Sequence, residues 1–278
     1  MIALKSKVKD MTNAYKELHY MESARNSLSG VKHVHDRSYE ILFVIDGDGS
    51  MLIGNNLYPI KENTVFLTSK MEIHNITPSS EKYIRNIINI NDDYIEKIIE
   101  LTGAEDFLSK LFGRRCIPLS DEDATLIKRY FSLINECDPD DPEHRIMLLR
   151  YITGMLKMLS DTKTTESQVI NNSISEAIAY IDRNLSEELT LEMICNHVHL
   201  SKYHFCRLFR EKTGMSPFKY IIECRISNAK KLLTYTSDSI SNIAVATGFS
   251  TSANFCNAFR KYEKLSPTDF RARNSKQP

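Results

Sequence analysis

The sequence predicts an α+β chain, in which a strand-rich N-terminal domain with flanking helices precedes an all-α C-terminal domain. Three observations predict this. Short apolar segments separated by turn residues fill residues 31–91, apolar residues at helical spacing fill most of the remainder, and a repeat of about 50 residues occupies the C-terminal part. We expect a first domain over residues 1–160, a polar linker over 161–172 and a second domain over 173–278.

Composition excludes several classes of protein. The chain has 278 residues, of which 42% are hydrophobic, enough to fill conventional cores. Its apolar runs are too short to span a bilayer, and residues 1–10 have no apolar segment typical of a secretory signal. The six cysteines are widely spaced and include no Cys-x-x-Cys pair. We therefore expect a cytoplasmic protein with reduced thiols.

Charge is unevenly distributed although the net charge is zero. Residues 171–278 hold 15 Lys and Arg against 10 Asp and Glu, which leaves 21 against 26 for residues 1–170. A basic C-terminal part beside an acidic N-terminal part is typical of a chain that meets a polyanion at one end.

The N-terminal strands alternate with turn residues. Tyr39–Ile45 and Ser50–Ile53 flank Asp46–Gly49, whose composition favours a hairpin, and Gly54–Asn56 forms a second turn. Further strands are expected over Leu57–Ile60, Thr64–Thr68 and Tyr83–Ile90. Short strands with frequent turns predict a small β-barrel or sandwich.

Helical spacing of apolar residues begins after the strands. It predicts helices over Asp93–Leu101, Asp121–Asn135 and Pro142–Leu159, with Asp121 and Asp141-Pro142 as N-terminal caps.

An internal repeat is the most specific feature of the sequence. At an offset of 50 residues, Phe205-Cys206 matches Phe255-Cys256, Phe209-Arg210 matches Phe259-Arg260, and Ser216-Pro217 matches Ser266-Pro267. Upstream, at an offset of 49, Ile194 matches Ile243 and Ser201 matches Ser250. Two similar units are therefore expected, each of two helices and a turn.

The first unit has the pattern of a helix-turn-helix. Thr190 caps a helix over Leu191–Val198, and Ser201 caps a second over Lys202–Thr213, which Gly214 closes. With Phe205, Leu208 and Phe209 facing the core, the outer face carries Lys202, Tyr203, Cys206, Arg207 and Arg210. Such a face suits the major groove of DNA, with Arg207 reading guanine and Lys202 and Arg210 holding phosphates.

The second unit repeats this pattern. Ser239 caps Ile240–Thr247, Gly248 supplies the turn, and Ser252–Tyr262 is the second recognition helix. Its outer face carries Ser252, Ala253, Cys256, Asn257 and Arg260. Asn257 is suited to read adenine, and the weaker basic character predicts a smaller contribution to affinity.

A long helix joins the two units. It is expected from Pro217 to about Thr234, with Phe218, Ile221, Ile222, Ala229, Leu232 and Leu233 on its apolar face. A helix of about 18 residues spans roughly 27 Å, close to the roughly 34 Å between successive major grooves. An ordinary α-helical bundle would explain either unit alone, but not two units with this spacing.

The C-terminal part resembles the AraC/XylS transcription regulators over roughly Ile174 to Arg273. In the first unit the resemblance rests on Leu189–Glu192, Ser201, Phe205, Leu208–Arg210, Gly214 and Ser216-Pro217. In the rest it rests on Arg225, Ala229, Leu232-Leu233, Ile243-Ala244, Gly248–Ser250, Phe255, Phe259–Lys261, Ser266-Pro267 and Phe270-Arg271. The chain departs from the family at Lys264, where glycine is common, at Cys195, where alanine is usual, and at Asn257, where a cation is frequent.

The resemblance implies site residues and partners. It implies double-stranded DNA contact by Lys202, Tyr203, Cys206 and Arg207 in the first unit and by Ser252, Asn254 and Asn257 in the second. It also implies a homodimer formed through the helices over residues 92–160, although packing of these helices onto the barrel explains their pattern equally well. Contact with RNA polymerase belongs to the same expectation.

In the N-terminal domain, His33-Val34-His35, Glu40 and Gly47 resemble the first cupin motif and His74-Asn75 the end of the second, with Asn63 at a common glycine position. The resemblance implies a closed, cupin-like β-barrel with flanking helices. Alternation along a strand places His33 and His35 on one face. One interpretation is a pocket for a small effector, lined by these histidines, Glu40, His74, Tyr39, Phe43 and Tyr58.

Two functions follow from these patterns. The first is a transcription regulator controlled by a small molecule, with no catalytic residue and no cofactor. The alternative is a metal-dependent cupin enzyme with His33, His35, Glu40 and His74 as ligands. The alternative leaves the repeat and the charge asymmetry unexplained.

Overall fold

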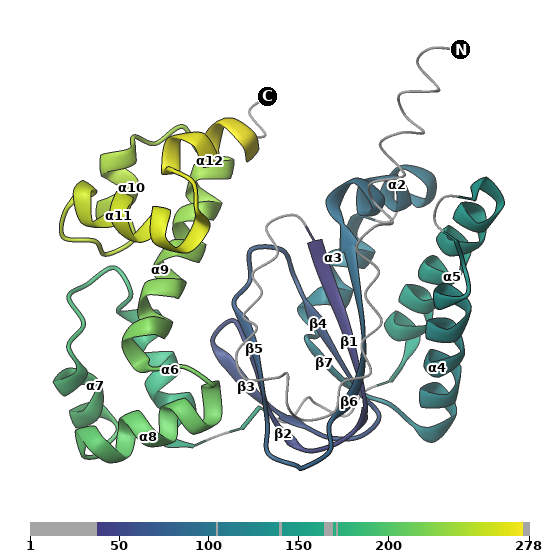
Figure 1. Cartoon of the computed structure of the whole chain (residues 1–278), viewed down its shortest axis with the longest axis horizontal. Helices are drawn as coiled ribbons and strands as arrows, with labels where there is room; N and C mark the ends of the chain where they lie inside the picture. The colour runs from purple at the N-terminus through teal and green to yellow at the C-terminus, as the bar shows by residue number, and fades with distance from the viewer. Residues whose placement is uncertain (1–37, 104, 139–140, 164–168, 171, 275–278) are drawn as a thin grey trace.

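The computed structural model describes residues 38–103, 105–138, 141–163, 169–170 and 172–274 (Figure 1). The strands are β1 (Ser38–Asp46), β2 (Gly49–Ile53), β3 (Asn56–Ile60), β4 (Thr64–Thr68), β5 (His74–Pro78), β6 (Ile84–Asn91) and β7 (Cys116–Pro118). The first helices are α2 (Asp92–Thr102), α3 (Glu105–Gly113), α4 (Asp121–Asn135) and α5 (Pro142–Asp161). The C-terminal helices are α6 (Ser173–Arg183), α7 (Leu191–His197), α8 (Lys202–Thr213), α9 (Pro217–Tyr235), α10 (Ile240–Ala246), α11 (Ser252–Glu263) and α12 (Pro267–Asn274). The predicted fold class is confirmed.

Two antiparallel sheets form the N-terminal domain. One has the strand order β6-β1-β4-β7 and the other β3-β2-β5. Among the described residues no strand of one sheet pairs with a strand of the other, so the sheets face each other without closing into a barrel. The expectation of a closed barrel is corrected to an open two-sheet arrangement.

The turn at Asp46–Gly49 does not form the predicted hairpin. β1 pairs with β4 and β6, whereas β2 pairs with β3 and β5, so this turn carries the chain from one sheet to the other. The amide of Ser79 donates to the Asp48 carbonyl at 2.8 Å, and the Asp48 amide donates to Ser80 Oγ at 3.0 Å. Turn residues reverse the chain, but they do not fix which strand the next one pairs with. The second predicted turn does form a hairpin, between β2 and β3.

Strand β1 is covered on both faces. Leu42 and Val44 point into the core between the two sheets, whereas Ile41 and Phe43 contact the core formed with helices α2–α5. In Figure 1 these helices lie on the side of the first sheet away from the second sheet. α4 has the predicted bounds, with Ser120 rather than Asp121 as its N-cap, and Asp141 caps α5 as predicted.

The helical domain is built around α9. Ser216 caps α9 and Pro217 occupies its first turn, where the missing N–H costs nothing. The lower unit in Figure 1 contains α6–α8 and the upper unit α10–α12, at opposite ends of α9. Phe218 is 55% exposed, so its predicted place on the apolar face of α9 is wrong. No helix among the described residues has the length and apolar character needed to cross a membrane.

The second sheet docks directly against the first helical unit. Leu52, Leu57 and Ile73 share one core with residues of α6–α9, including Phe209 and Tyr220. Ser50 Oγ donates to the Lys212 carbonyl at 2.7 Å, and Asn75 Nδ2 donates to the Thr213 carbonyl at 2.7 Å. Farther along, Ser227 Oγ donates to the Met71 carbonyl at 2.6 Å. These contacts fix the first unit against the sheet.

Candidate nucleic-acid interface

The first recognition helix, α8, is held by capping and by aromatic packing. Thr190 Oγ1 accepts from the Met193 amide and caps α7, and Ser201 caps α8, as predicted. Phe205 and Phe209 have no exposed surface, and their ring centroids lie 5.4 Å apart. Gly214 ends α8 with a φ of 73°. Burial of one face therefore sets which side chains α8 presents outward.

The outer face of α8 is open to solvent. Ser201, Lys202, Tyr203, Arg207 and Arg210 are exposed, with Tyr203 82% exposed. A large exposed ring beside two arginines suits packing against the backbone of a nucleic acid. Lys202 Nζ lies 3.2 Å from Glu192 Oε2. Glu192 therefore neutralises part of the positive charge of Lys202.

Cys206 lies at the edge of this face. It is half-buried and packs against the core of the first unit. A small side chain at this position leaves room for a partner to approach α8 closely.

The second recognition helix, α11, has the same construction with less charge. Ser239 caps α10 as predicted, and Thr251 caps α11 by accepting from the Asn254 amide at 3.1 Å. Phe255 and Phe259 have no exposed surface. The cap at Thr251 was not predicted, although a threonine directly before the apolar pattern is a typical signal.

The outer face of α11 is mostly amide and hydroxyl groups. Asn254, Asn257 and Arg260 are exposed, whereas Ser252 is half-buried. Ser252 Oγ bonds to Ser241 Oγ at 3.2 Å, and Asn254 Nδ2 donates to Ser250 Oγ at 3.0 Å. Both side chains therefore also stabilise the turn before α11. Asn257 keeps the amide geometry that can pair with adenine.

α9 sets the distance between the recognition helices. Its 19 residues correspond to about 28 Å, near the roughly 34 Å between adjacent major grooves. A buried ion pair joins α9 to α11, with Lys230 Nζ 3.1 Å from Glu263 Oε2. Lys230 is 1% exposed. Nothing in the sequence pattern distinguished this lysine from the exposed cations near it.

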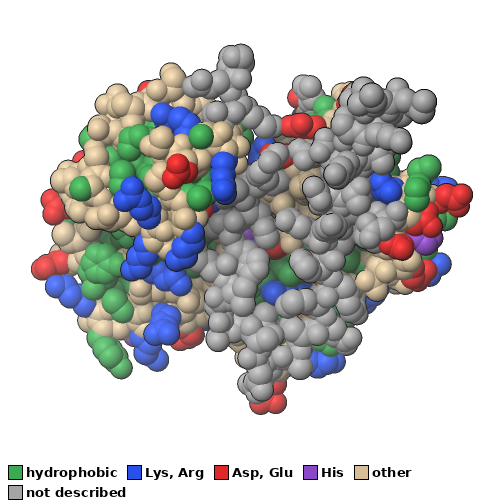
Figure 2. Space-filling view, turned by 45° about the horizontal axis from the view of Figure 1, so that its top comes forward, with side chains coloured by type: hydrophobic (Ala, Val, Ile, Leu, Met, Phe, Trp, Pro, Cys, Tyr) green, Lys and Arg blue, Asp and Glu red, His purple; other side chains and the backbone are tan. Residues whose placement is uncertain are grey.

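Lys and Arg side chains gather on this domain. Figure 2 shows them over the left half of the molecule, where the helical domain lies, with exposed apolar side chains among them. This placement agrees with the positive balance of residues 171–278 and suits a surface that meets phosphates.

Lys264 ends α11 in a left-handed conformation, with a φ of 60°, at the position where the first unit has Gly214. A lysine there costs strain that glycine avoids. We expect Lys264→Gly to raise the free energy of unfolding by about 0.5–1 kcal/mol, measured by urea denaturation. Lys261→Gly, at a helical position of α11, is the matched control and is expected to lower it by a similar amount. A loss of stability in Lys264→Gly would contradict this.

The predicted effector residues divide between two faces of β1. Glu40 and His74 are buried together, with His74 Nε2 3.7 Å from Glu40 Oε1 and His74 Nδ1 3.0 Å from the Glu72 carbonyl. Burial disfavours the charged imidazole, but Glu40 and the Glu72 carbonyl outweigh it and raise the pKa of His74 above its ordinary value. Tyr58 lies in the core between the sheets.

Tyr39 and Phe43 lie apart from these residues. Tyr39 packs against Phe112 with tilted rings whose centroids lie 4.7 Å apart, and the ring centroids of Phe43 and Phe131 lie 6.2 Å apart. Both therefore face the helices, on the side of β1 opposite Leu42, and a pocket between the sheets would not include them. Both faces of β1 are buried, so apolar residues on this strand do not by themselves show which ones line a pocket.

A metal site of three or more His, Cys, Asp or Glu side chains is not found among the described residues. His33 and His35 lie outside the described residues. Asn63 adopts a φ of 56°, as expected for a residue at a common glycine position of the second cupin motif.

The fold and the exposed recognition helices define a class, the DNA-binding transcription regulators with a paired helix-turn-helix domain. A family model described as an AraC-like ligand binding domain matches residues 19–148, and one described as a helix-turn-helix domain matches residues 194–273. The chain therefore belongs to the AraC family of transcriptional regulators, with an N-terminal ligand-binding domain of the AraC type.

The chain is similar to several known regulators. The chain is 27% identical over 249 residues to the HTH-type transcriptional regulator YfiF of Bacillus subtilis, covering 84% of this chain and 76% of that protein. It is 22% identical over 236 residues to the lactose operon transcription activator of Staphylococcus xylosus, covering 82% and 81%. An AraC-type transcriptional regulator structure from Chromobacterium violaceum is 32% identical, with a TM-score of 0.36 over 38% of this chain and 95% of that one. These matches give no support to a cupin enzyme.

Proposed function

We propose that the protein binds two adjacent major grooves of one DNA duplex with α8 and α11, and that a small effector acting on the N-terminal domain controls this binding. The observation that carries the proposal is the repeated scaffold: two capped helices with buried phenylalanines and open outer faces lie at the two ends of α9. We place the domain boundaries at residues 160 and 173, on either side of the linker.

Each predicted DNA-binding side chain has a proposed role. Arg207 and Asn257 read base edges, because guanidinium and amide groups can make paired hydrogen bonds to guanine and adenine. Lys202, Arg210 and Arg260 hold phosphates, and Tyr203 packs against the sugar-phosphate backbone. Ser201, Cys206, Ser252 and Asn254 position the helices closely against the groove.

The division between base reading and phosphate binding is testable. We expect Arg207→Ala to weaken binding to the preferred site by about 1–3 kcal/mol and to relax the preference at one base pair. Arg210→Ala is expected to weaken binding to all sequences alike and to reduce the salt dependence by about one phosphate contact. Equilibrium binding at several salt concentrations measures both effects.

Lys61→Ala, exposed in the turn between β3 and β4, serves as the control and is expected to leave DNA binding unchanged. Identical behaviour of the two arginine variants, in sequence preference and in salt dependence, would refute the division.

The remaining expectations concern assembly. Leu126 on α4 and Ile146 and Met147 on α5 are exposed apolar side chains, with Ile146 72% exposed, and they support a homodimer formed through these helices. Sedimentation at micromolar concentration tests this, and a monomer would contradict it. The proposal also includes a cytoplasmic location, no enzymatic activity and contact with RNA polymerase. The relatives named as transcription regulators support only the regulatory role.

A further inference from the structure

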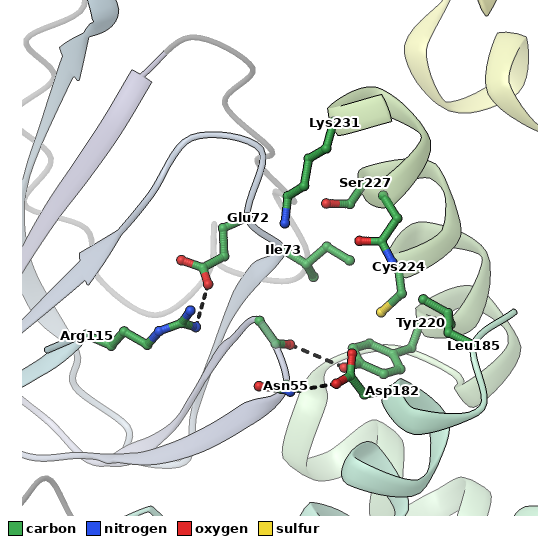
Figure 3. A pocket seen from close by; sticks show the side chains of 12 residues that line it. Asn55, Glu72, Ile73, Arg115, Asp182, Leu185, Tyr220, Cys224, Ser227 and Lys231 are labelled. Carbon is green, nitrogen blue, oxygen red and sulfur yellow. Dashed lines mark hydrogen bonds and ion pairs between the residues drawn. The ribbon is translucent and has the colours of Figure 1, made fainter. Parts of the chain in front are cut away.

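A cavity of about 180 Å³ lies where the N-terminal domain meets the helical domain (Figure 3). One wall comes from the turn after β2 and the segment before β5, and the other from the end of α6 and from α9. Ligand sites for drug-sized molecules have about 300–1,000 Å³. This cavity therefore suits a small metabolite.

Hydrogen bonds across the boundary hold the two walls together. Asn55 Nδ2 donates to Asp182 Oδ2 at 2.9 Å, and the Tyr220 hydroxyl donates to the Gly54 carbonyl at 3.2 Å. The Ser227–Met71 bond lies beside them. Because each bond joins one domain to the other, the cavity has this shape only while the domains are docked.

Two of the four charged side chains in the cavity form an ion pair with each other, and the other two do not. Arg115 and Glu72, both on the N-terminal wall, form an ion pair with each other. Lys231, on α9, has no ion pair within the described part of the chain, and the Asp182 carboxylate accepts only the Asn55 amide there. Figure 3 places Lys231 and Asp182 at opposite ends of the cavity, with Ile73 and Cys224 between them. A positive end, a negative end and a partly apolar middle remain for a ligand.

We propose that this cavity binds a small zwitterionic metabolite of the ω-amino acid type, in which a short carbon chain separates the two charges, with its carboxylate at Lys231, its ammonium group at Asp182 and its chain along Ile73 and Cys224. The four charges of the lining sum to zero, which matches a ligand with no net charge. A neutral sugar fits less well, because Tyr220 is the cavity's one aromatic side chain and is 1% exposed, leaving no ring face for stacking.

This site also explains how a ligand would control DNA binding by the recognition helices. A molecule that touches both walls binds the docked arrangement more tightly than an undocked one, and this difference in affinity shifts the population toward docking. Docking fixes the first unit through Ser50–Lys212 and Asn75–Thr213. The core between the sheets is filled by side chains such as Leu42, Met51 and Phe66, each at most 1% exposed, so a ligand there would have to displace them. The inference rests on the proposed function and names the site of its effector.

Thermal unfolding of the full chain with a series of unbranched ω-amino acids of increasing chain length tests the proposal, each at about ten times the Kd of roughly 1 mM expected for so small a ligand. D-glucose, D-ribose and glycerol serve as neutral hydroxylated probes. We expect at least one amino acid to raise the midpoint by about 3 °C or more, and the neutral probes to have no effect. The same amino acid is expected to change the affinity of the protein for DNA.

Two variants test whether the ligand binds in this cavity. Asp182→Asn and Lys231→Gln remove one exposed charge each and are expected to weaken binding of that amino acid by at least about tenfold. Lys219→Gln, also exposed on α9 but outside the cavity, is the matched control and is expected to bind normally.

Three results would overturn the inference: no midpoint shift with any amino acid, a shift with the neutral probes that both variants retain, or an amino-acid shift that both variants retain. DNA binding by the unliganded protein is measured separately. A protein that binds DNA but gives any of these results keeps its proposed function and loses this site, whereas failure to bind DNA under all conditions refutes the function itself.

Discussion

Phe259→Ala is expected to lower the free energy of unfolding of the second helical unit by about 3–5 kcal/mol. Phe259 has no exposed surface and lies 5.6 Å from the Phe255 ring and 5.4 Å from the Phe270 ring, measured between centroids. Truncation leaves a cavity among three rings that pack α11 and α12 against α9. Such a loss is comparable with the whole stability of a small domain.

The variant therefore distinguishes the contribution of α11 to DNA binding from that of α8. Hydrogen exchange is expected to rise in α10–α12 and to stay low in the sheets, and DNA binding is expected to retain only the element read by α8. Val245→Ala, at a 71% exposed position of α10, is the control and is expected to change stability by less than about 0.5 kcal/mol. Unchanged exchange in α10–α12 would show that Phe259 does not hold the unit together.

Gly248→Ala is expected to lower the free energy of unfolding by about 2–4 kcal/mol. Gly248 has a φ of 81°, and a Cβ there would lie 2.4 Å from the Leu185 carbonyl oxygen and 2.9 Å from the Arg225 guanidinium. Left-handed strain and steric conflict therefore add. Arg225 Nε donates to that same carbonyl at 3.0 Å, and its Nη2 donates to the Glu187 carbonyl at 2.7 Å. The turn of the second unit thus contacts the loop between α6 and α7. The substitution is therefore expected to disturb the packing of the two units against each other.

Gly103→Ala separates strain from steric conflict. Gly103 has a φ of 65°, but a Cβ there would meet no atom within 4 Å, so only the strain of about 1–2 kcal/mol is expected. Thermal or urea unfolding of both variants measures the difference. Equal losses in the two variants would mean that the contact between Gly248 and the loop is unimportant.

Much of the helical domain could be predicted because its signals are local. Thr190, Ser201 and Ser239 each cap the helix that follows them, and α8 runs from Lys202 to Thr213 as expected. A cap, a periodic apolar face and a closing glycine act within a few residues, so the sequence carries them directly. The 50-residue repeat then related two such units without any knowledge of their packing.

Features that depend on distant contacts were missed or misread. The composition of Asp46–Gly49 indicated a turn, but pairing of β1 with β4 and β6 is set by residues far along the chain. β5, β7 and α3 are short and were not predicted. The docking of the second sheet on α8 and α9 was not predicted either, because Ser50, Asn75 and Ser227 resemble any polar residues of a strand or helix until their partners are known.

Selection of bound DNA from a random duplex pool, with the full-length protein at two salt concentrations, tests the central claim most directly. The two recognition helices at the ends of α9 predict an asymmetric DNA site with two sequence elements about one helical turn of DNA apart. Arg207→Ala is expected to degrade one element and Asn257→Ala the other. Enrichment of a single element, or of no sequence at either salt concentration with or without the amino-acid ligand, would contradict a paired reader of DNA.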